Sequence, residues 1–122
     1  MVKNFFDNIV TVQNLLDRRT LLEGLAEEAA ELSQAALKLI RAEKMNSNVT
    51  LVDDVEAEKQ LLEEIADVQC YLNVLGLSPQ RSVLVNVLVE QKMHRWIERL
   101  ESARNKKDRK STRLNSSHHD MS

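Results

Sequence analysis

Apolar residues recur every three or four positions along most of the chain, which is the spacing of an amphipathic α-helix. The pattern predicts four helices, over residues 3–18, 20–44, 55–75 and 79–103. The segment Met45–Asp54, MNSNVTLVDD, interrupts the pattern and is expected to be a loop. The chain is therefore expected to be an all-α, bundle-forming single domain of four helices.

The junction between the first two predicted helices carries terminal signals of both kinds. Arg18 and Arg19 suit the last turn of a helix, where cations complement the helix dipole. Thr20 is expected to cap the second helix, and Glu23, three residues on, would complete a capping box.

The junction between the third and fourth predicted helices is marked by glycine and proline. Gly76 is placed to end the third helix as a C-terminal cap. Ser78 followed by Pro79 is typical of an N-cap with proline at the first helical position. The fourth helix is expected to run from there to about Ala103.

The last residues lack a helical period and have few apolar side chains. From Asn105 onward the sequence NKKDRKSTRLNSSHHDMS is expected to be disordered, and it resembles translated cloning or adapter sequence. The predicted organisation is thus a folded domain over residues 1–104 and a tail over residues 105–122. His118 and His119 are better interpreted as part of this polar tail than as a metal site.

Charge, cysteine content and the N-terminal residues limit the expected partners and the expected location of the protein. The 122 residues carry a formal net charge of −2, which argues against nucleic acid as the main partner. The one cysteine, Cys70, excludes an internal disulfide and suits a reducing compartment. Near the N-terminus, Asp7 and Asn8 interrupt the apolar residues, so neither a secretory segment nor a membrane span is expected. The cytoplasm is the predicted location.

Acidic residues intrude on the apolar stripe of the second predicted helix. At about 100° per residue, one narrow stripe contains Leu21, Leu25, Glu28, Leu32, Ala35 and Leu39. Glu28 therefore stands where a leucine would be expected. Glu31 lies about a sixth of a turn to one side, and Glu27 lies somewhat farther out.

The third predicted helix repeats this arrangement. Its apolar stripe consists of Leu61, Ile65, Val68, Leu72 and Leu75. Glu64 is expected at the edge of the stripe, and Asp67 lies three residues beyond it on the same side. Two neighbouring helices thus each place a pair of acids beside a surface that is expected to be buried.

A divalent cation would relieve the repulsion among these acids. Several like charges beside a buried surface are costly unless they are paired or coordinate a metal. Ligation by oxygen alone suits Mg²⁺ or Mn²⁺. A di-iron site would add a Glu-x-x-His motif on each of two helices, and neither helix has a histidine there. A solvated acidic face is the alternative, but two acid pairs at stripe edges favour the metal site.

The fourth predicted helix separates a basic row from an apolar arc. Lys92, Arg95 and Arg99 follow one another at i, i+3 and i+7. The apolar arc beside them consists of Val85, Val89, Met93, Trp96, Ile97 and Leu100. Such cations are often surface residues that favour the helix dipole. Together with a Mg²⁺ site, however, they indicate a polyphosphate ligand, and the chain has no glycine-rich phosphate loop to bind it instead.

The acidic motifs resemble those of a known family, the MazG-like all-α nucleoside triphosphate pyrophosphohydrolases. The family signature is EExxE on one helix and ExxD on the next. Here the motifs are Glu27-Glu28-Ala-Ala-Glu31 and Glu64-Ile-Ala-Asp67. The resemblance covers roughly residues 5–101.

The resemblance implies an activity and a role for each acid. Members of the family cleave a nucleoside triphosphate between the α- and β-phosphates, releasing a nucleoside monophosphate and pyrophosphate, and they assemble as dimers or tetramers. The implied Mg²⁺ ligands are Glu28, Glu31, Glu64 and Asp67. Glu27 would orient the attacking water or act as a base, so Glu27 and Glu28 are the expected catalytic carboxylates. The implied phosphate-binding residues are Lys92, Arg95 and Arg99.

Three alternatives stay open from the sequence. One is a non-catalytic helical module for interaction or oligomerisation. Another is a degenerate family member that binds nucleotide without hydrolysing it, because Trp96 stands where many relatives carry asparagine. The third, within the family, is an activity resembling that of phosphoribosyl-ATP pyrophosphatases.

Overall fold

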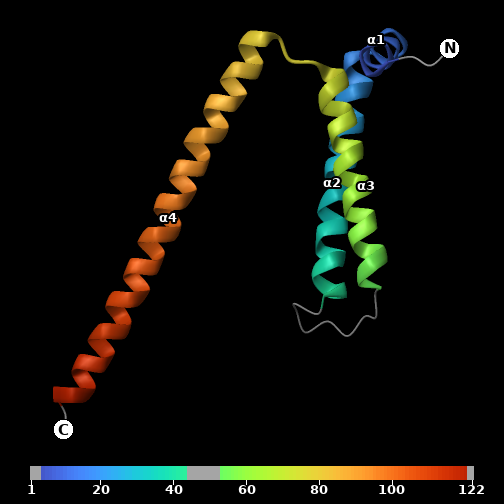
Figure 1. The fold of residues 1–122 in the computed structure, drawn as a ribbon. Coiled ribbons are helices and arrows are strands. Elements are labelled where there is room, and N and C mark those ends of the chain that lie inside the picture. Colours follow the sequence, from blue (N-terminus) through green and yellow to red (C-terminus); the bar gives the residue numbers. More distant parts are fainter. Residues whose placement is uncertain (1–3, 44–52, 121–122) are drawn as a thin grey trace. The chain divides into compact units, whose positions relative to one another are not determined.

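The computed structural model describes residues 4–43 and 53–120, and it describes side chains as far as residue 113. Within these ranges the chain forms four helices and no strand (Figure 1). The helices are α1 (Phe5–Leu15), α2 (Arg18–Ala42), α3 (Asp54–Leu75) and α4 (Pro79–Asp120). The predicted all-α class with four helices is confirmed, whereas most of the predicted loop Met45–Asp54 lies outside the described residues.

The chain divides into two compact units, Met1–Gly76 and Leu77–Ser122. The first unit contains α1, α2 and α3, and the second contains α4. The division between residues 104 and 105 stays a prediction.

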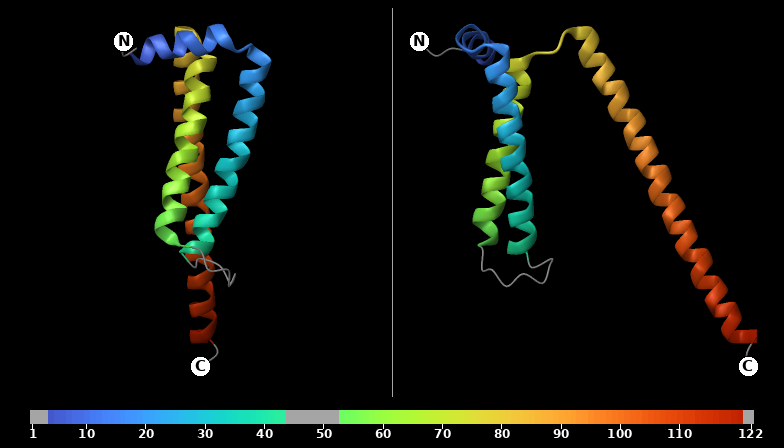
Figure 2. Two further views of the ribbon diagram at one scale, coloured as in Figure 1. Left: turned by 90° about the vertical axis from the view of Figure 1, so that its right-hand side faces the viewer. Right: turned by 180° about the vertical axis from the view of Figure 1, so that it is seen from behind.

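In the first unit, α2 and α3 run antiparallel and side by side, and α1 crosses this pair near the end of α3 (Figure 2). One hydrogen bond fixes the crossing: the Gln13 side-chain amide donates to the backbone carbonyl of Val74 at 2.9 Å. The pair formed by α2 and α3 is the scaffold that positions the acidic residues.

The junction between α1 and α2 differs from the prediction. Asp17 is the N-cap of α2, and its carboxylate accepts a hydrogen bond from the backbone N–H of Thr20 at 2.7 Å. Arg18 and Arg19 therefore begin α2 instead of ending α1. The predicted capping box is wrong, because Glu23 pairs with Arg19 at 2.9 Å. A carboxylate binds a helix N-terminus more strongly than a hydroxyl does, which explains why Asp17 takes this role.

The junction that follows α3 agrees with the prediction. Gly76 ends α3 with a φ of 62°, and its N–H donates to the Leu72 carbonyl at 3.3 Å. The Ser78 hydroxyl accepts a hydrogen bond from the backbone N–H of Arg81 at 3.2 Å, and Pro79 is the first residue of α4. Glycine suits this left-handed position because it has no Cβ.

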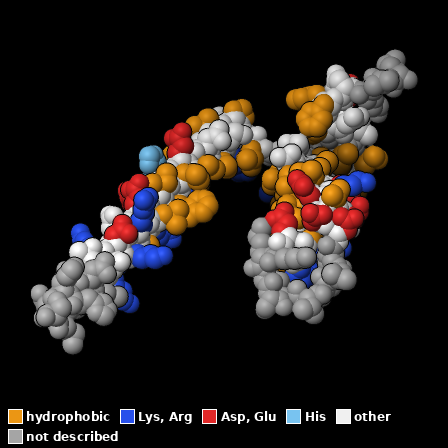
Figure 3. All heavy atoms as spheres, turned by 60° about the horizontal axis from the view of Figure 1, so that its bottom comes forward, with side chains coloured by type: hydrophobic (Ala, Val, Ile, Leu, Met, Phe, Trp, Pro, Cys, Tyr) orange, Lys and Arg blue, Asp and Glu red, His pale blue; other side chains and the backbone are white. Residues whose placement is uncertain are grey.

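Helix α4 extends to Asp120, beyond the predicted end near Ala103. The side chains of residues 104–113 are all exposed, so local backbone hydrogen bonds are what hold this part of the helix. The residues of its apolar arc are also exposed, and Figure 3 shows apolar side chains following the helix. The side chains of His118 and His119 lie outside the described residues.

The predicted stripe of α2 faces α3. Leu21 and Ala35 are buried, and the other four stripe residues, Leu25, Glu28, Leu32 and Leu39, are half-buried. Residues on either side of the stripe are mostly exposed. The helical period of α2 was therefore sufficient to identify the surface that packs.

The stripe of α3 is rotated relative to the prediction. Ile65 and Leu72 are 38% and 52% exposed, whereas Ala57 is buried and Tyr71 is half-buried. Glu64 lies within the row that faces α2, not at its edge. The rotation of α3 has a physical reason. A large side chain, Tyr71, packs against the space that Gly24 leaves on α2 because glycine has no side chain.

Replacing Gly24 by alanine is expected to destabilise the first unit. A Cβ at this position would overlap the Tyr71 ring. Alanine improves helix propensity by about 1 kcal/mol, but overpacking a core costs about 1–3 kcal/mol. Thermal unfolding of Gly24→Ala should therefore show a lower Tm than wild type.

Ser33→Ala is the matched control, since Ser33 is an exposed residue of the same helix. Its Tm should equal or slightly exceed that of wild type. A rise in Tm for Gly24→Ala as large as that for Ser33→Ala would contradict the packing described for Tyr71.

Candidate metal centre

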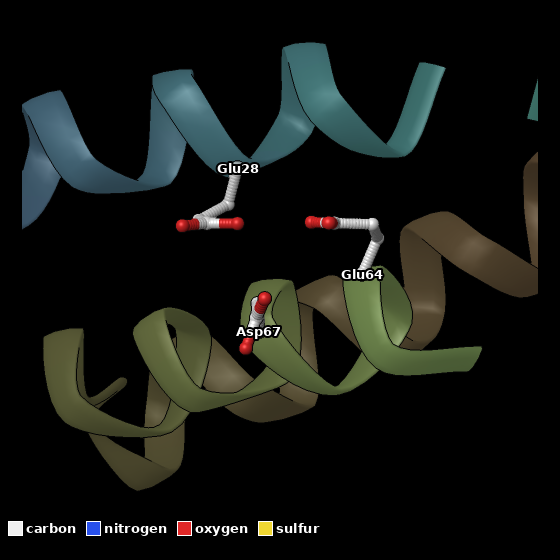
Figure 4. Close-up of side chains that lie close together, drawn as sticks. All are labelled: Glu28, Glu64 and Asp67. Atoms are coloured by element: carbon white, nitrogen blue, oxygen red, sulfur yellow. The ribbon is translucent and has the colours of Figure 1, made fainter. Parts of the chain in front are cut away.

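Facing turns of α2 and α3 bring three carboxylates together. Glu28 comes from α2, and Glu64 and Asp67 come from α3. One carboxylate oxygen from each lies within 4.8 Å of the other two. In Figure 4, Glu28 and Glu64 point toward one another from opposite helices, and Asp67 lies one helical turn along α3. We call these three residues the acidic cluster.

The acidic cluster is partly shielded from water. Glu28 and Glu64 are half-buried, and the Oε2 atom of each is buried with no hydrogen-bond partner among the described residues. Asp67 is exposed, so the cluster keeps an opening to solvent. Figure 3 shows acidic side chains of the first unit gathered beside apolar ones. Unpartnered carboxylate oxygens are unfavourable in such a setting unless a cation neutralises them.

The surroundings of the acidic cluster disfavour ionisation. Desolvation, followed by the charge of Glu31, raises the pKa of Glu28 to about 7. Desolvation also raises the pKa of Glu64, and the charges of Glu31 and Asp67 act in the same direction. Without a cation, protons are therefore retained by carboxylates that would be ionised in water at neutral pH.

Glu31 and Glu27 occupy different positions from the acidic cluster. Glu31 is exposed and is not one of the three residues whose oxygens lie within 4.8 Å of one another, although its charge acts on both Glu28 and Glu64. Glu27 is exposed on α2, beside Glu28. The structure thus brings together three of the four predicted metal ligands and leaves Glu31 beside them.

The predicted phosphate-binding residues Lys92, Arg95 and Arg99 are exposed residues of α4, in the second unit. Arg99 donates from its Nε atom to the carbonyl of Arg95 at 3.3 Å, which is a contact within the helix. Their role toward phosphate stays a prediction.

A cavity of about 630 Å³ lies between α2 and α3 and reaches Glu31 and Glu64. Its wall also contains Lys38 and Arg41, which belong to none of the predicted site motifs. Helical spacing places Lys38 on the same face of α2 as Glu31, seven residues earlier, but it does not distinguish Lys38 or Arg41 from other cations near the end of a helix.

The acidic cluster fits a hard divalent cation. Its donors are all carboxylate oxygens, which Mg²⁺ and Mn²⁺ prefer. The side chains of Glu28 and Glu64 point toward one another from different helices, and each has a buried oxygen without a hydrogen-bond partner among the described residues, so one cation can neutralise both carboxylates. The described part of α2 and α3 contains no histidine, so these two helices offer the cation no imidazole ligand.

The raised pKa values predict that metal-free protein loses stability as pH rises. Between pH 4.5 and about 7 the folded state keeps a proton on Glu28 that the unfolded state releases, so the free energy of unfolding falls across this window. The Tm in EDTA should be higher at pH 5 than at pH 8. The hydrogen bonds from Thr20 lower the pKa of Asp17. The stability that Asp17 contributes is therefore lost only as the pH falls below this window.

Glu28→Gln removes one of the two titrating groups and should make the fall in Tm between pH 5 and pH 8 smaller. Glu58→Gln, at an exposed position of α3, should leave the fall unchanged. A wild-type Tm that is equal at both pH values would contradict the raised pKa values.

Comparisons of the chain with protein-family models, with curated proteins and with solved structures find no match. Among the helices of the described ranges, none has an apolar run long enough to cross a membrane.

Proposed function

We propose that the protein is a Mg²⁺-dependent nucleoside triphosphate pyrophosphohydrolase that converts a nucleoside triphosphate to the monophosphate and pyrophosphate. One observation carries the proposal: two carboxylates that point toward one another from adjacent helices each have a buried oxygen without a hydrogen-bond partner among the described residues, beside a third acid that is open to solvent. The EExxE and ExxD motifs, which resemble those of the MazG-like family, contain all three acids.

Glu28, Glu64 and Asp67 hold the ion in this proposal, with Glu31 as a further ligand from the exposed rim. Mg²⁺ is the proposed cofactor, and Mn²⁺ suits the same oxygen donors. When bound, the ion supplies positive charge that offsets the phosphate charges and makes water more acidic.

The protein residues orient and deprotonate the attacking water. Glu27 is exposed beside Glu28, where its carboxylate is free to accept a proton from a water that attacks the phosphoryl group. The bond that breaks is the one joining the α- and β-phosphates. On α4, Lys92, Arg95 and Arg99 are the proposed partners of the phosphates, because cations stabilise the charge that develops on the leaving pyrophosphate.

A homodimer or homotetramer in the cytoplasm is the proposed form of the enzyme. The apolar arc of α4 is exposed, and an assembly would cover such a surface. This arc also favours a second candidate function, that of a non-catalytic helical module for interaction or oligomerisation.

A panel of canonical and modified nucleoside triphosphates with Mg²⁺ tests the proposal. The expected result is release of pyrophosphate and a nucleoside monophosphate from at least one substrate. Orthophosphate as the sole product would exclude cleavage between the α- and β-phosphates. Absence of any product across the panel would favour the interaction module.

A further inference from the structure

Building on the proposed hydrolysis, we infer that Lys38 and Arg41 of α2 bind the terminal phosphates of the substrate in the cavity beside the acidic cluster. This site would lie in the same unit as the acids and is additional to the basic row of α4. The ligand class is a polyphosphate chain that carries a divalent cation.

Two half-buried cations line this cavity without an anionic partner among the described residues. The Lys38 ammonium donates a hydrogen bond to the Gln60 side-chain oxygen at 3.0 Å. Within the described parts of the chain, neither Lys38 nor Arg41 forms an ion pair, although acids line the same cavity. A half-buried cation whose partner in the described part of the chain is an uncharged amide oxygen is available to bind an anionic ligand.

The spacing of the residues matches a phosphate chain that extends from the acidic cluster. Gln60, which holds Lys38, precedes Glu64 by four residues, or about 6 Å along the axis of α3. Side chains on a helix lean toward its N-terminus, so those of Lys38 and Arg41 lean toward Glu31. The cavity of about 630 Å³ falls within the range of small-molecule sites, which is about 300–1,000 Å³.

The charges of the cavity wall explain why the anion must arrive with a cation. Three acids, Glu31, Glu63 and Glu64, and two bases, Lys38 and Arg41, line the wall. The acids repel a bare polyphosphate. A divalent ion at the acidic cluster offsets the negative charge of these acids, so that the wall no longer repels the polyphosphate. The two bases then complement phosphate oxygens that the ion does not reach.

Binding of inorganic tripolyphosphate to the full chain in the presence of Mg²⁺, measured by calorimetry, tests the inference. Tripolyphosphate has neither base nor sugar, so its affinity reports only on contacts to phosphate and to the ion, and the variants below separate Lys38 and Arg41 from the basic row of α4. Wild type should bind it, and Lys38→Gln and Arg41→Gln should each raise the Kd about 10- to 100-fold, the effect of losing one charge-assisted hydrogen bond. Lys38→Arg keeps the charge and should bind more tightly than Lys38→Gln.

Arg19→Gln is the matched control, because Arg19 is an exposed cation of α2 that does not line the cavity. Its Kd should equal that of wild type, and circular dichroism establishes that each variant is folded. The inference is overturned if Lys38→Gln and Arg41→Gln both bind tripolyphosphate as wild type does. It is equally overturned if folded wild type with Mg²⁺ does not bind tripolyphosphate.

Failure of the proposed function would look different. Absence of pyrophosphate release from nucleotides, together with tripolyphosphate binding that depends on Lys38, would refute the hydrolysis and leave the phosphate site standing. Pyrophosphate release that is equal in wild type and in both variants would support the hydrolysis and refute the phosphate site.

Discussion

Glu28→Gln is expected to reduce pyrophosphate release by more than about 100-fold, because losing a residue that holds the ion costs more than the roughly 10- to 100-fold lost with a residue behind the ligands. Glutamine retains the shape of the side chain but loses the negative charge that holds the cation. Release of pyrophosphate from nucleotide with Mg²⁺ at pH 8 provides the measurement.

The same variant should remain folded and, without metal, should be at least as stable as wild type at pH 8. The reason is that Glu28→Gln removes a charge whose ionisation the folded state disfavours. Glu58→Gln, which alters an exposed acid of α3, should keep full activity. The proposal is falsified if Glu28→Gln releases pyrophosphate at the wild-type rate.

Mg²⁺ is expected to raise the Tm of the wild-type chain. An ion that binds only the folded state stabilises it by about 2.7 kcal/mol at a concentration 100-fold above its Kd. For a unit of this size, that corresponds to a rise of roughly 10–20 °C. Differential scanning calorimetry of protein first treated with EDTA and then titrated with MgCl₂ gives the shift.

Glu64→Gln should abolish most of this shift, and NaCl at equal ionic strength should not reproduce it. Binding also requires ionised carboxylates, so the shift should be larger at pH 8 than at pH 6. An interaction module without a metal site would show the same Tm with and without Mg²⁺, and that result would exclude the proposed cofactor.

Much of the fold could be predicted because local signals specify it. The helical period of α2 identified its packed stripe, and Gly76 and Ser78 mark the junction between α3 and α4 through hydrogen bonds within a few residues. The capping box failed because two residues compete for one helix end, and the sequence pattern does not rank Asp17 above Thr20.

The rotation of α3 could not be predicted from its own residues. Its leucines and isoleucine favour one face, but the position of Tyr71 depends on a glycine on another helix, 47 residues earlier. Such a contact is tertiary and leaves no periodic signal in α3. The same rotation moved Glu64 from the predicted edge into the row that faces α2.

The acids of the site were predictable, and the cavity was not. Spacing alone placed Glu28 inside an apolar stripe, which is unusual enough to notice. Lys38 and Arg41 resemble any cations near the end of a helix until the structure places them in one cavity wall with Glu31 and Glu64. A cavity exists only between elements, so a pattern within one helix cannot reveal it.

Glu28, an acid in the packed stripe of α2, lowers the stability of the fold while serving the proposed activity. A leucine at position 28 would complete the apolar stripe and remove the unpartnered carboxylate oxygen. A directed-evolution campaign that selects for heat resistance alone would therefore move toward apolar residues at positions 28 and 64, and the proposed activity would be lost along the way. Selection for a more thermostable variant should therefore include turnover as a second criterion. Stabilising substitutions should be sought away from the surface that α2 and α3 share.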